Sequence, residues 1–250
     1  MKKLLLIGCL LLTAACQSAP AATQAESAPQ TTSQTPPPPA TATSIPTLTP
    51  VPTASPTSTP VPMFFTEDFN ADLGAWASFQ TGGAQPALVG LENDLLRIDF
   101  ASPDTWYYAI HNAHEYSSVN ISAKFFGTAS GSIGVVCNYS ETNGWYEFNL
   151  ASDGTYSVLL GQWLSPEIAQ YTPIVSDTTE YLQVGILDHE VGLTCQDNLL
   201  FLFINGKLFR KLDVSHIGLA GGKVGISAAS YADIPMTATF DWVQVSEPGQ

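Results

Sequence analysis

The segment 145–150 carries residue types whose spacing could bind a sugar. Because side chains alternate along a strand, Trp145, Glu147 and Asn149 would share one face, opposite three apolar side chains. An aromatic ring can stack on the C–H groups of a sugar while a carboxylate and an amide bind its hydroxyls. The alternative, that Trp145 only covers the sheet or packs beneath a loop, stays open. The same alternation on other segments adds three candidate ligand-binding residues: Tyr107, His111 and Asn138.

Catalytic motifs are scarce in this sequence. Asp188-His189-Glu190 joins two carboxylates to an imidazole, which would suit acid–base or metal chemistry, but it falls between two predicted strands and favours a loop. Neither H-E-x-x-H nor G-x-S-x-G occurs. We therefore expect no enzyme and no catalytic residues, with catalysis by carboxylates at an unfamiliar spacing as the alternative.

The composition excludes one class of partner. The 250 residues hold 8 Lys and Arg against 22 Asp and Glu, a net charge of −14, so no basic surface is available for nucleic acid. A hydrophobic content of 45% excludes disorder throughout, and a charged content of only 12% suits an extracytoplasmic β-protein.

The N-terminus has the parts of a secretory signal. Lys2 and Lys3 precede an apolar run that is too short to span a membrane, and small residues lead to Cys16. This ending resembles the lipobox of bacterial lipoproteins, although Thr13 stands where that family prefers Leu, Val or Ile. The resemblance implies a signal peptide at 1–15 and a lipid anchor on Cys16, which would hold the domain outside the cell membrane or outer membrane. An ordinary signal peptide with a chance cysteine is the alternative.

Residues 16–62 form a predicted disordered linker. From 17 to 62 the sequence holds twelve of the eighteen prolines, eleven threonines and one charged residue, Glu26. Such a segment buries too little apolar surface to offset its ordering entropy, so we expect an extended, solvated spacer.

The remainder, 63–250, is predicted to be one all-β domain. Short runs rich in β-branched and aromatic residues are separated by turn pairs such as Asn205-Gly206, and no segment shows a helical apolar period. The clearest predicted strands are 95–100, 106–110, 119–126, 133–139, 145–150, 156–160, 181–187, 199–204, 207–212, 223–228 and 237–245.

Three groups of motifs in this domain follow the order of a known family. The first joins Glu67-Asp68-Phe69-Asn70 to Gly74-Ala75-Trp76, the second lies in 134–156, and the third in 202–243. The domain thereby resembles bacterial concanavalin A-like lectin/glucanase jelly rolls, which include laminin-G-like and keto-disaccharide-hydrolase-like modules. The resemblance implies a sandwich of two antiparallel sheets, preceded here by the linker. It implies little about activity, since this sandwich hosts lectins, hydrolases and spacers.

The family's catalytic motif is not found. Retaining glucanases of this fold carry E-x-D-x-x-E on one strand, and their mechanism needs two carboxyl groups about 5–5.5 Å apart. The nearest string begins at Glu92 but ends in Arg97, and it falls in a turn.

Two further sites follow from the resemblance. Removal of Cys9 with the signal and lipidation of Cys16 leave Cys137 and Cys195, which stand where the family has cysteines, so a disulfide is expected, with two buried thiols as the alternative. Jelly rolls of this kind also place acids near the first core Phe and in the closing strand. Asp68 and Asp241 take these places and predict a structural Ca²⁺, with a solvated pair of acids as the alternative.

These observations together predict an envelope-anchored, non-catalytic lipoprotein that displays a carbohydrate-binding domain. Its partners would be the membrane, through the lipid, and a polysaccharide or glycan. A structural or protein-interaction module of the cell surface is the first alternative, and a divergent glycoside hydrolase is the second.

Overall fold

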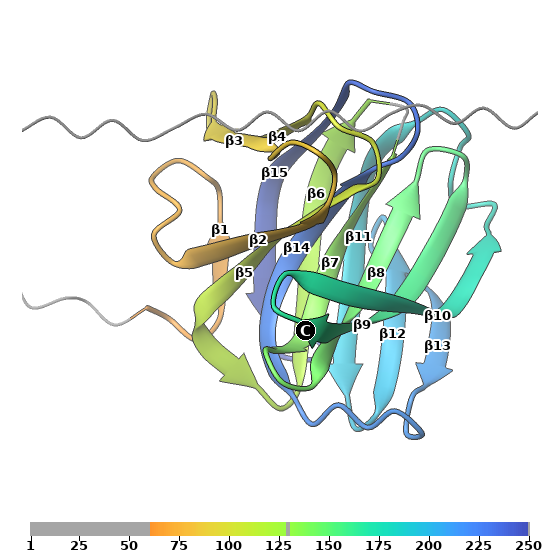
Figure 1. The fold of residues 1–250 in the computed structure, drawn as a ribbon. Coiled ribbons are helices and arrows are strands. Elements are labelled where there is room, and N and C mark those ends of the chain that lie inside the picture. The colour runs from red at the N-terminus through yellow and green to blue at the C-terminus, as the bar shows by residue number, and fades with distance from the viewer. Residues whose placement is uncertain (1–60, 129–130, 250) are drawn as a thin grey trace, which may run out of the picture. The chain divides into compact units, whose positions relative to one another are not determined.

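The computed structural model describes residues 61–128 and 131–249, which fold into fifteen strands joined by turns (Figure 1). Within these residues no helix is long and apolar enough to cross a membrane. The predicted signal peptide, Cys16 and all but the last two residues of the predicted linker lie outside the described residues.

The strands form two antiparallel sheets, which confirms the predicted all-β sandwich. Sheet A has the order β13 (Lys207–Asp213), β12 (Leu199–Ile204), β11 (Leu187–Gln196), β6 (Val119–Gly127), β15 (Met236–Ser246), β4 (Leu96–Phe100) and β3 (Leu88–Leu91), and β1 (Phe65–Glu67) also pairs with β15. Sheet B has the order β10 (Ile168–Thr178), β9 (Thr155–Ser165), β8 (Gly144–Ala151), β7 (Gly131–Ser140), β14 (Gly222–Ser230), β5 (Thr105–Tyr116) and β2 (Trp76–Gly82).

The main core lies between the inner faces of the two sheets. In β12 the buried residues Leu200, Leu202 and Ile204 alternate with less buried ones, as expected for a strand with one face on the core. Sheet B contributes alternate residues in the same way, for example Phe148 and Leu150 of β8. This packing fixes which side chains of each strand point outward.

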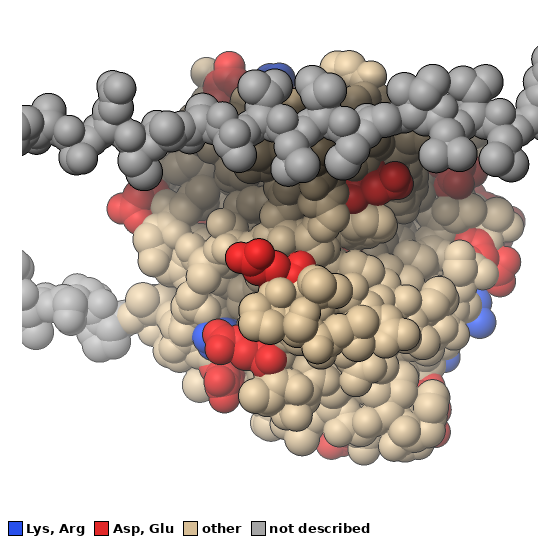
Figure 2. All heavy atoms as spheres, in the orientation of Figure 1, with Lys and Arg blue, Asp and Glu red and all other residues tan. Residues whose placement is uncertain are grey.

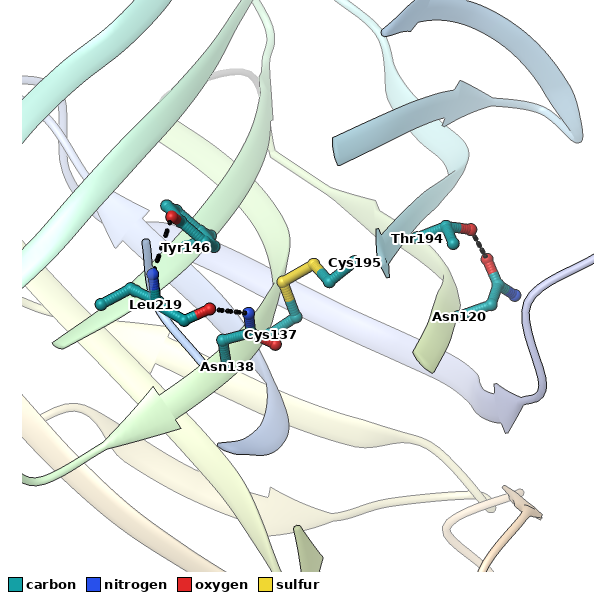
Figure 3. Close-up of a disulfide and its surroundings, with 7 residues drawn as sticks. All are labelled: Asn120, Cys137, Asn138, Tyr146, Thr194, Cys195 and Leu219. Carbon is teal, nitrogen blue, oxygen red and sulfur yellow. Dashed lines mark hydrogen bonds between the residues drawn. A yellow bond between two sulfur atoms is a disulfide. The ribbon is translucent and has the colours of Figure 1, made fainter. Parts of the chain in front are cut away.

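Cys137 of β7 and Cys195 of β11 form a disulfide with a Cα–Cα distance of 6.6 Å, which confirms the predicted pair (Figure 3). Because β7 belongs to sheet B and β11 to sheet A, the bond joins the two sheets. It closes a loop of 58 residues, for which the chain-entropy model gives a stabilisation of roughly 4 kcal/mol.

The outer face of sheet B is also buried. Every residue of β8 is buried, and the same holds for all but the last residue of β7. A second hydrophobic cluster, distinct from the main core, fills this outer face: Tyr108, Ile110, Val136, Tyr139 and Trp145.

The cover over this face comes from the edges of sheet B itself. The hydroxyl oxygens of Thr81 on β2 and Tyr171 on β10 are hydrogen bonded at 2.6 Å, although these strands are the opposite edges of the sheet. In Figure 1, β2 and β10 extend toward each other from the two edges, and the two strands are in contact. Sheet B therefore curls until its edges close over its outer face.

Strand prediction from sequence succeeds where the local signal is strong. The strand 199–204 matches β12, and the Asn205-Gly206 turn has positive φ at both residues. The predicted strand 181–187 is wrong, because these residues form turns and β11 begins only at Leu187. The loop predicted for Asp188 to Glu190 is also wrong, since it lies on β11. Four strands were not predicted, β1, β2, β3 and β10, and β11 was predicted as a strand only around Cys195.

Candidate functional site

Trp145, Glu147 and Asn149 lie together on the outer face of β8. The Tyr108 hydroxyl donates a hydrogen bond of 2.7 Å to Glu147 Oε2, and Asn149 Nδ2 donates one of 2.9 Å to Glu147 Oε1. Ser227 Oγ in turn donates to Asn149 Oδ1 at 3.0 Å. The carboxyl group of Glu147 is thus the centre of a buried polar network.

Burial raises the pKa of Glu147, and the hydrogen bonds from Tyr108 and Asn149 act in the opposite direction. None of the ion pairs among the described residues includes Glu147. The pKa of Tyr108 is also raised, first by burial and then by the neighbouring Glu147 carboxyl. A carboxyl group in such a site holds its proton to higher pH than an exposed one.

Trp145 is fully covered, with 0% of its surface exposed. Its ring lies against Gly161 of β9, where a Cβ would come within 2.2 Å of the indole. The indole N–H has no hydrogen-bond partner among the described residues. Five aromatic rings have centroids 5.4–6.2 Å from its own: Phe79, Tyr108, Tyr139, Trp163 and Tyr171.

The other three candidate ligand-binding residues lie elsewhere. Tyr107 and His111 lie on the inner face of β5, where the rings of His111 and Phe65 have centroids 4.2 Å apart and desolvation lowers the pKa of His111 to about 4. Asn138 lies in a bulge of β7 with a φ of 52°, and its Nδ2 donates to Leu219 O at 3.1 Å. The six candidates therefore do not form one surface.

Asp68 and Asp241 are both exposed. The first and last strands pair, with Glu67 of β1 opposite Val243 of β15. Within 61–128 and 131–249, however, no group of three or more His, Cys, Asp or Glu side chains is arranged to hold a metal ion. A structural Ca²⁺ at these two acids stays a prediction.

An open depression, which we call the Tyr139–Trp163 depression, lies beside the covered cluster. Its volume is about 470 Å³. Two aromatic residues, Tyr139 and Trp163, and two exposed acids, Glu141 and Glu167, line it together with Leu164, Ser165 and Pro166. Sequence reasoning missed this site because the predicted strand 156–160 stopped short of Trp163 and the β10 half of the hairpin was not predicted. The aromatic residue three positions beyond that strand was the available signal.

The packing explains how this depression is positioned. The buried Trp145 ring lies 5.4 Å from the Trp163 ring and 5.6 Å from the Tyr139 ring, measured between centroids. Ala169 of β10 pairs with Trp163 of β9, so the β9–β10 hairpin fixes the backbone that carries the Trp163 indole. Trp163 is thus partly accessible and rests on the covered cluster, to which the buried Tyr139 itself belongs.

Comparison with known proteins identifies the fold. No protein-family model matches the chain, and no curated protein matches it. A Bacillus licheniformis β-glucanase is 12% identical, with a TM-score of 0.52, 74% of this chain and 98% of that chain covered. A Bacteroides ovatus GH16 protein, solved with a G4G4G3G product, is 13% identical with a TM-score of 0.52, at 73% and 99% coverage. The carbohydrate recognition domain of Emp46p, in a metal-free form, is 14% identical with a TM-score of 0.49, at 73% and 95% coverage.

The domain therefore has the concanavalin A-like jelly-roll fold, as the sequence motifs predicted. The same finding overturns the expectation that the chain is not an enzyme, because the similar structures with a TM-score of 0.52 include glucanases and a glycosidic hydrolase. The missing E-x-D-x-x-E string excludes one arrangement of carboxylates. It does not exclude catalysis by carboxylates that are placed differently on the same fold.

Proposed function

We propose that this protein binds carbohydrate and that the Tyr139–Trp163 depression receives a sugar. The observation that carries the proposal is the composition of this open site, in which two aromatic residues lie beside two exposed carboxylates. Ring faces stack on the C–H groups of a sugar, and carboxylate oxygens accept hydrogen bonds from its hydroxyls. The names of the structurally similar proteins, which include glucanases and a complex with an oligosaccharide product, support a polysaccharide as the partner.

The experiment compares two partly buried tryptophans on different sheets. The full-length chain is screened on a glycan array, and the strongest ligand is then titrated against wild type, Trp163→Ala and Trp242→Ala. We expect at least about tenfold weaker binding for Trp163→Ala, since it removes a central aromatic contact, and unchanged binding for Trp242→Ala on sheet A. No ligand on the array, or equal loss in both variants, would contradict the proposal.

Glycoside hydrolysis is a second candidate function, and Glu147 is the observation that favours it. A buried carboxyl group with a raised pKa is what a general acid near neutral pH requires. The curled edges of sheet B would have to open for a substrate to reach it, because Glu147 is fully buried. The test is release of reducing sugar from mixed-linkage β-glucan by wild type and by Glu147→Gln. Release that Glu147→Gln abolishes would support hydrolysis, and its absence in wild type would refute it.

The proposed location is the cell envelope, with the lipid on Cys16 as the anchor and 17–62 as the spacer. The support is the sequence alone: a basic start, a short apolar run, small residues before Cys16 and a Pro/Thr-rich segment after it. Cys16→Ser in the producing cell should move the protein from the detergent phase to the aqueous phase. Equal partitioning of the two forms would refute the anchor.

A further inference from the structure

Two more depressions adjoin the Tyr139–Trp163 depression at one end of the sandwich. The middle one, of about 350 Å³, shares Tyr139 with the first. The third, of about 390 Å³, shares Ser117, Ala220 and Gly221 with the middle one. The three therefore follow one another along the turns that join β7 to β8, β5 to β6 and β11 to β12. We call this series the end groove.

The third depression contains a buried polar atom that lacks a partner. Asn138 lines it and is 7% exposed, and its Oδ1 has no hydrogen-bond partner among the described residues. Its Nδ2 is already used in the bond to Leu219 O, so the amide cannot turn without losing that bond (Figure 3). An acceptor held in this way and left unpaired destabilises the fold, unless water or a ligand donates to it.

The third depression is also lined by a residue with a hydroxyl donor, Tyr146. The N–H of Leu219 donates to the Tyr146 hydroxyl at 3.4 Å, and Tyr146 lines the same depression. The oxygen of Tyr146 accepts that bond, so its hydrogen remains to be donated. Leu219 bonds to both side chains through different atoms, its O to Asn138 and its N–H to Tyr146, so the two polar groups lie on either side of this one residue (Figure 3). A sugar carries several hydroxyls, which both donate and accept, and so offers partners of both kinds.

The charges along the end groove are all of one sign. Glu141 and Glu167 line the first depression, Glu115 the middle one and Asp197 the third, and none of the described residues lining the three is Lys or Arg. Figure 2 shows the same imbalance on the face in view, where the few charged side chains are mostly acidic. An acidic polysaccharide would be repelled, whereas a neutral one can donate its hydroxyls to the carboxylates.

We infer that the end groove binds an extended, neutral polysaccharide chain along several of its sugar units. The inference rests on the proposed function, since the first unit would occupy the Tyr139–Trp163 depression. Further units of the same chain occupy the middle and third depressions, where Asn138 accepts from a hydroxyl and Tyr146 donates to one. The volume of each depression is within the usual range of 300–1,000 Å³ for small-ligand sites, so each holds one or two sugar units.

The test is the dependence of affinity on chain length. The full-length chain is titrated calorimetrically with β-1,3-1,4-glucan oligosaccharides from two to eight units, alongside Asn138→Gly. Glycine keeps the positive φ of Asn138 and removes its amide. We expect wild-type affinity to rise with length and Asn138→Gly to bind the longest oligosaccharide about three- to tenfold more weakly, with the shortest one unaffected.

Asn205→Gly is the matched control, because Asn205 also has a positive φ of 50° but lies in the β12–β13 turn, outside the groove. It should bind every oligosaccharide like wild type. The inference about the end groove is overturned if affinity does not depend on chain length, or if Asn138→Gly binds long chains like wild type. Either result leaves the proposed sugar binding at Trp163 intact. Absence of any bound glycan, on the array and in this series, overturns the proposed function as well.

Discussion

The outer face of sheet A is exposed, whereas the outer face of sheet B is buried. On sheet A the outer face remains open, with Phe126 of β6 40% exposed and Lys124 paired to Asp188 at the surface. On sheet B the corresponding face holds Trp145 and Glu147, both fully buried. Each face is built from the same alternation of side chains along antiparallel strands.

The difference lies in the edge strands. The edges of sheet A are β13 and β3, and all four residues of β3 are exposed. Sheet B ends in β2 and β10, which curl until Thr81 and Tyr171 are hydrogen bonded across the face. Whether an outward-pointing side chain is exposed or buried in a second core therefore depends on whether the edge strands fold over that face. This is why Trp145 lies beneath the proposed binding site and Trp163 lines it.

The largest test of this contrast is removal of the covered tryptophan. Trp145→Ala should lower the free energy of unfolding by about 3–5 kcal/mol, because it leaves a cavity among five aromatic rings. Trp242→Ala, which removes a partly exposed tryptophan from sheet A, should cost clearly less. Urea denaturation measures both. Equal losses would show that the cover over sheet B contributes no core-like packing.

A smaller loss of stability is expected when a methyl group is added at Gly161, where β9 lies against the Trp145 indole. A Cβ at Gly161 would lie 2.2 Å from the buried indole, so Gly161→Ala should destabilise the domain by about 1–3 kcal/mol. At Gly192 of sheet A the nearest atom, Phe203 Cβ, is 3.1 Å away, and Gly192→Ala should cost less. Thermal unfolding of the two variants provides the comparison. A larger loss at Gly192 would contradict tight closure over sheet B.

The smallest expected effect is on the pH dependence of stability. Burial raises the pKa of Glu147 above its ordinary value of 4.5, so between the two values the folded chain holds one more proton than the unfolded chain. Its contribution to stability is full below pH 4.5 and is lost as the pH rises through the folded pKa. Glu147→Gln should lose this part of the pH dependence, and the exposed control Glu180→Gln should keep it. Melting temperatures measured between pH 4 and 8 test this prediction. Parallel plots of melting temperature against pH for wild type and Glu147→Gln would refute it.

The sequence was informative where one short segment decides the outcome. The hairpin around Asn205-Gly206, the order of the family motifs and the pair Cys137–Cys195 were all predictable, since each depends on local residues or on a recognisable pattern. The cover over sheet B was not, because β10 contains Pro173, which weakens any strand signal and is tolerated only at an edge or a bulge.

The candidate site was predicted in its chemistry but not in its residues. Alternation placed Trp145, Glu147 and Asn149 on one face, and the structure does the same. Whether that face meets solvent depends on a contact between Thr81 and Tyr171, ninety residues apart, which no local pattern reveals. The accessible Trp163 could be found only once its hairpin was known.

The N-terminal entry to the domain also determines where a pulling force acts. Val61 O lies 2.9 Å from His114 Nε2, Met63 O accepts a hydrogen bond of 2.6 Å from the Tyr116 hydroxyl, and β1 pairs with β15 over three residues. Tension applied to the chain ahead of Val61 therefore meets these few contacts first, before it reaches either curled edge of sheet B or the disulfide. Because β1 pairs with β15 over only three residues, it should separate first under load and lengthen the chain while the two sheets keep their other strand pairs.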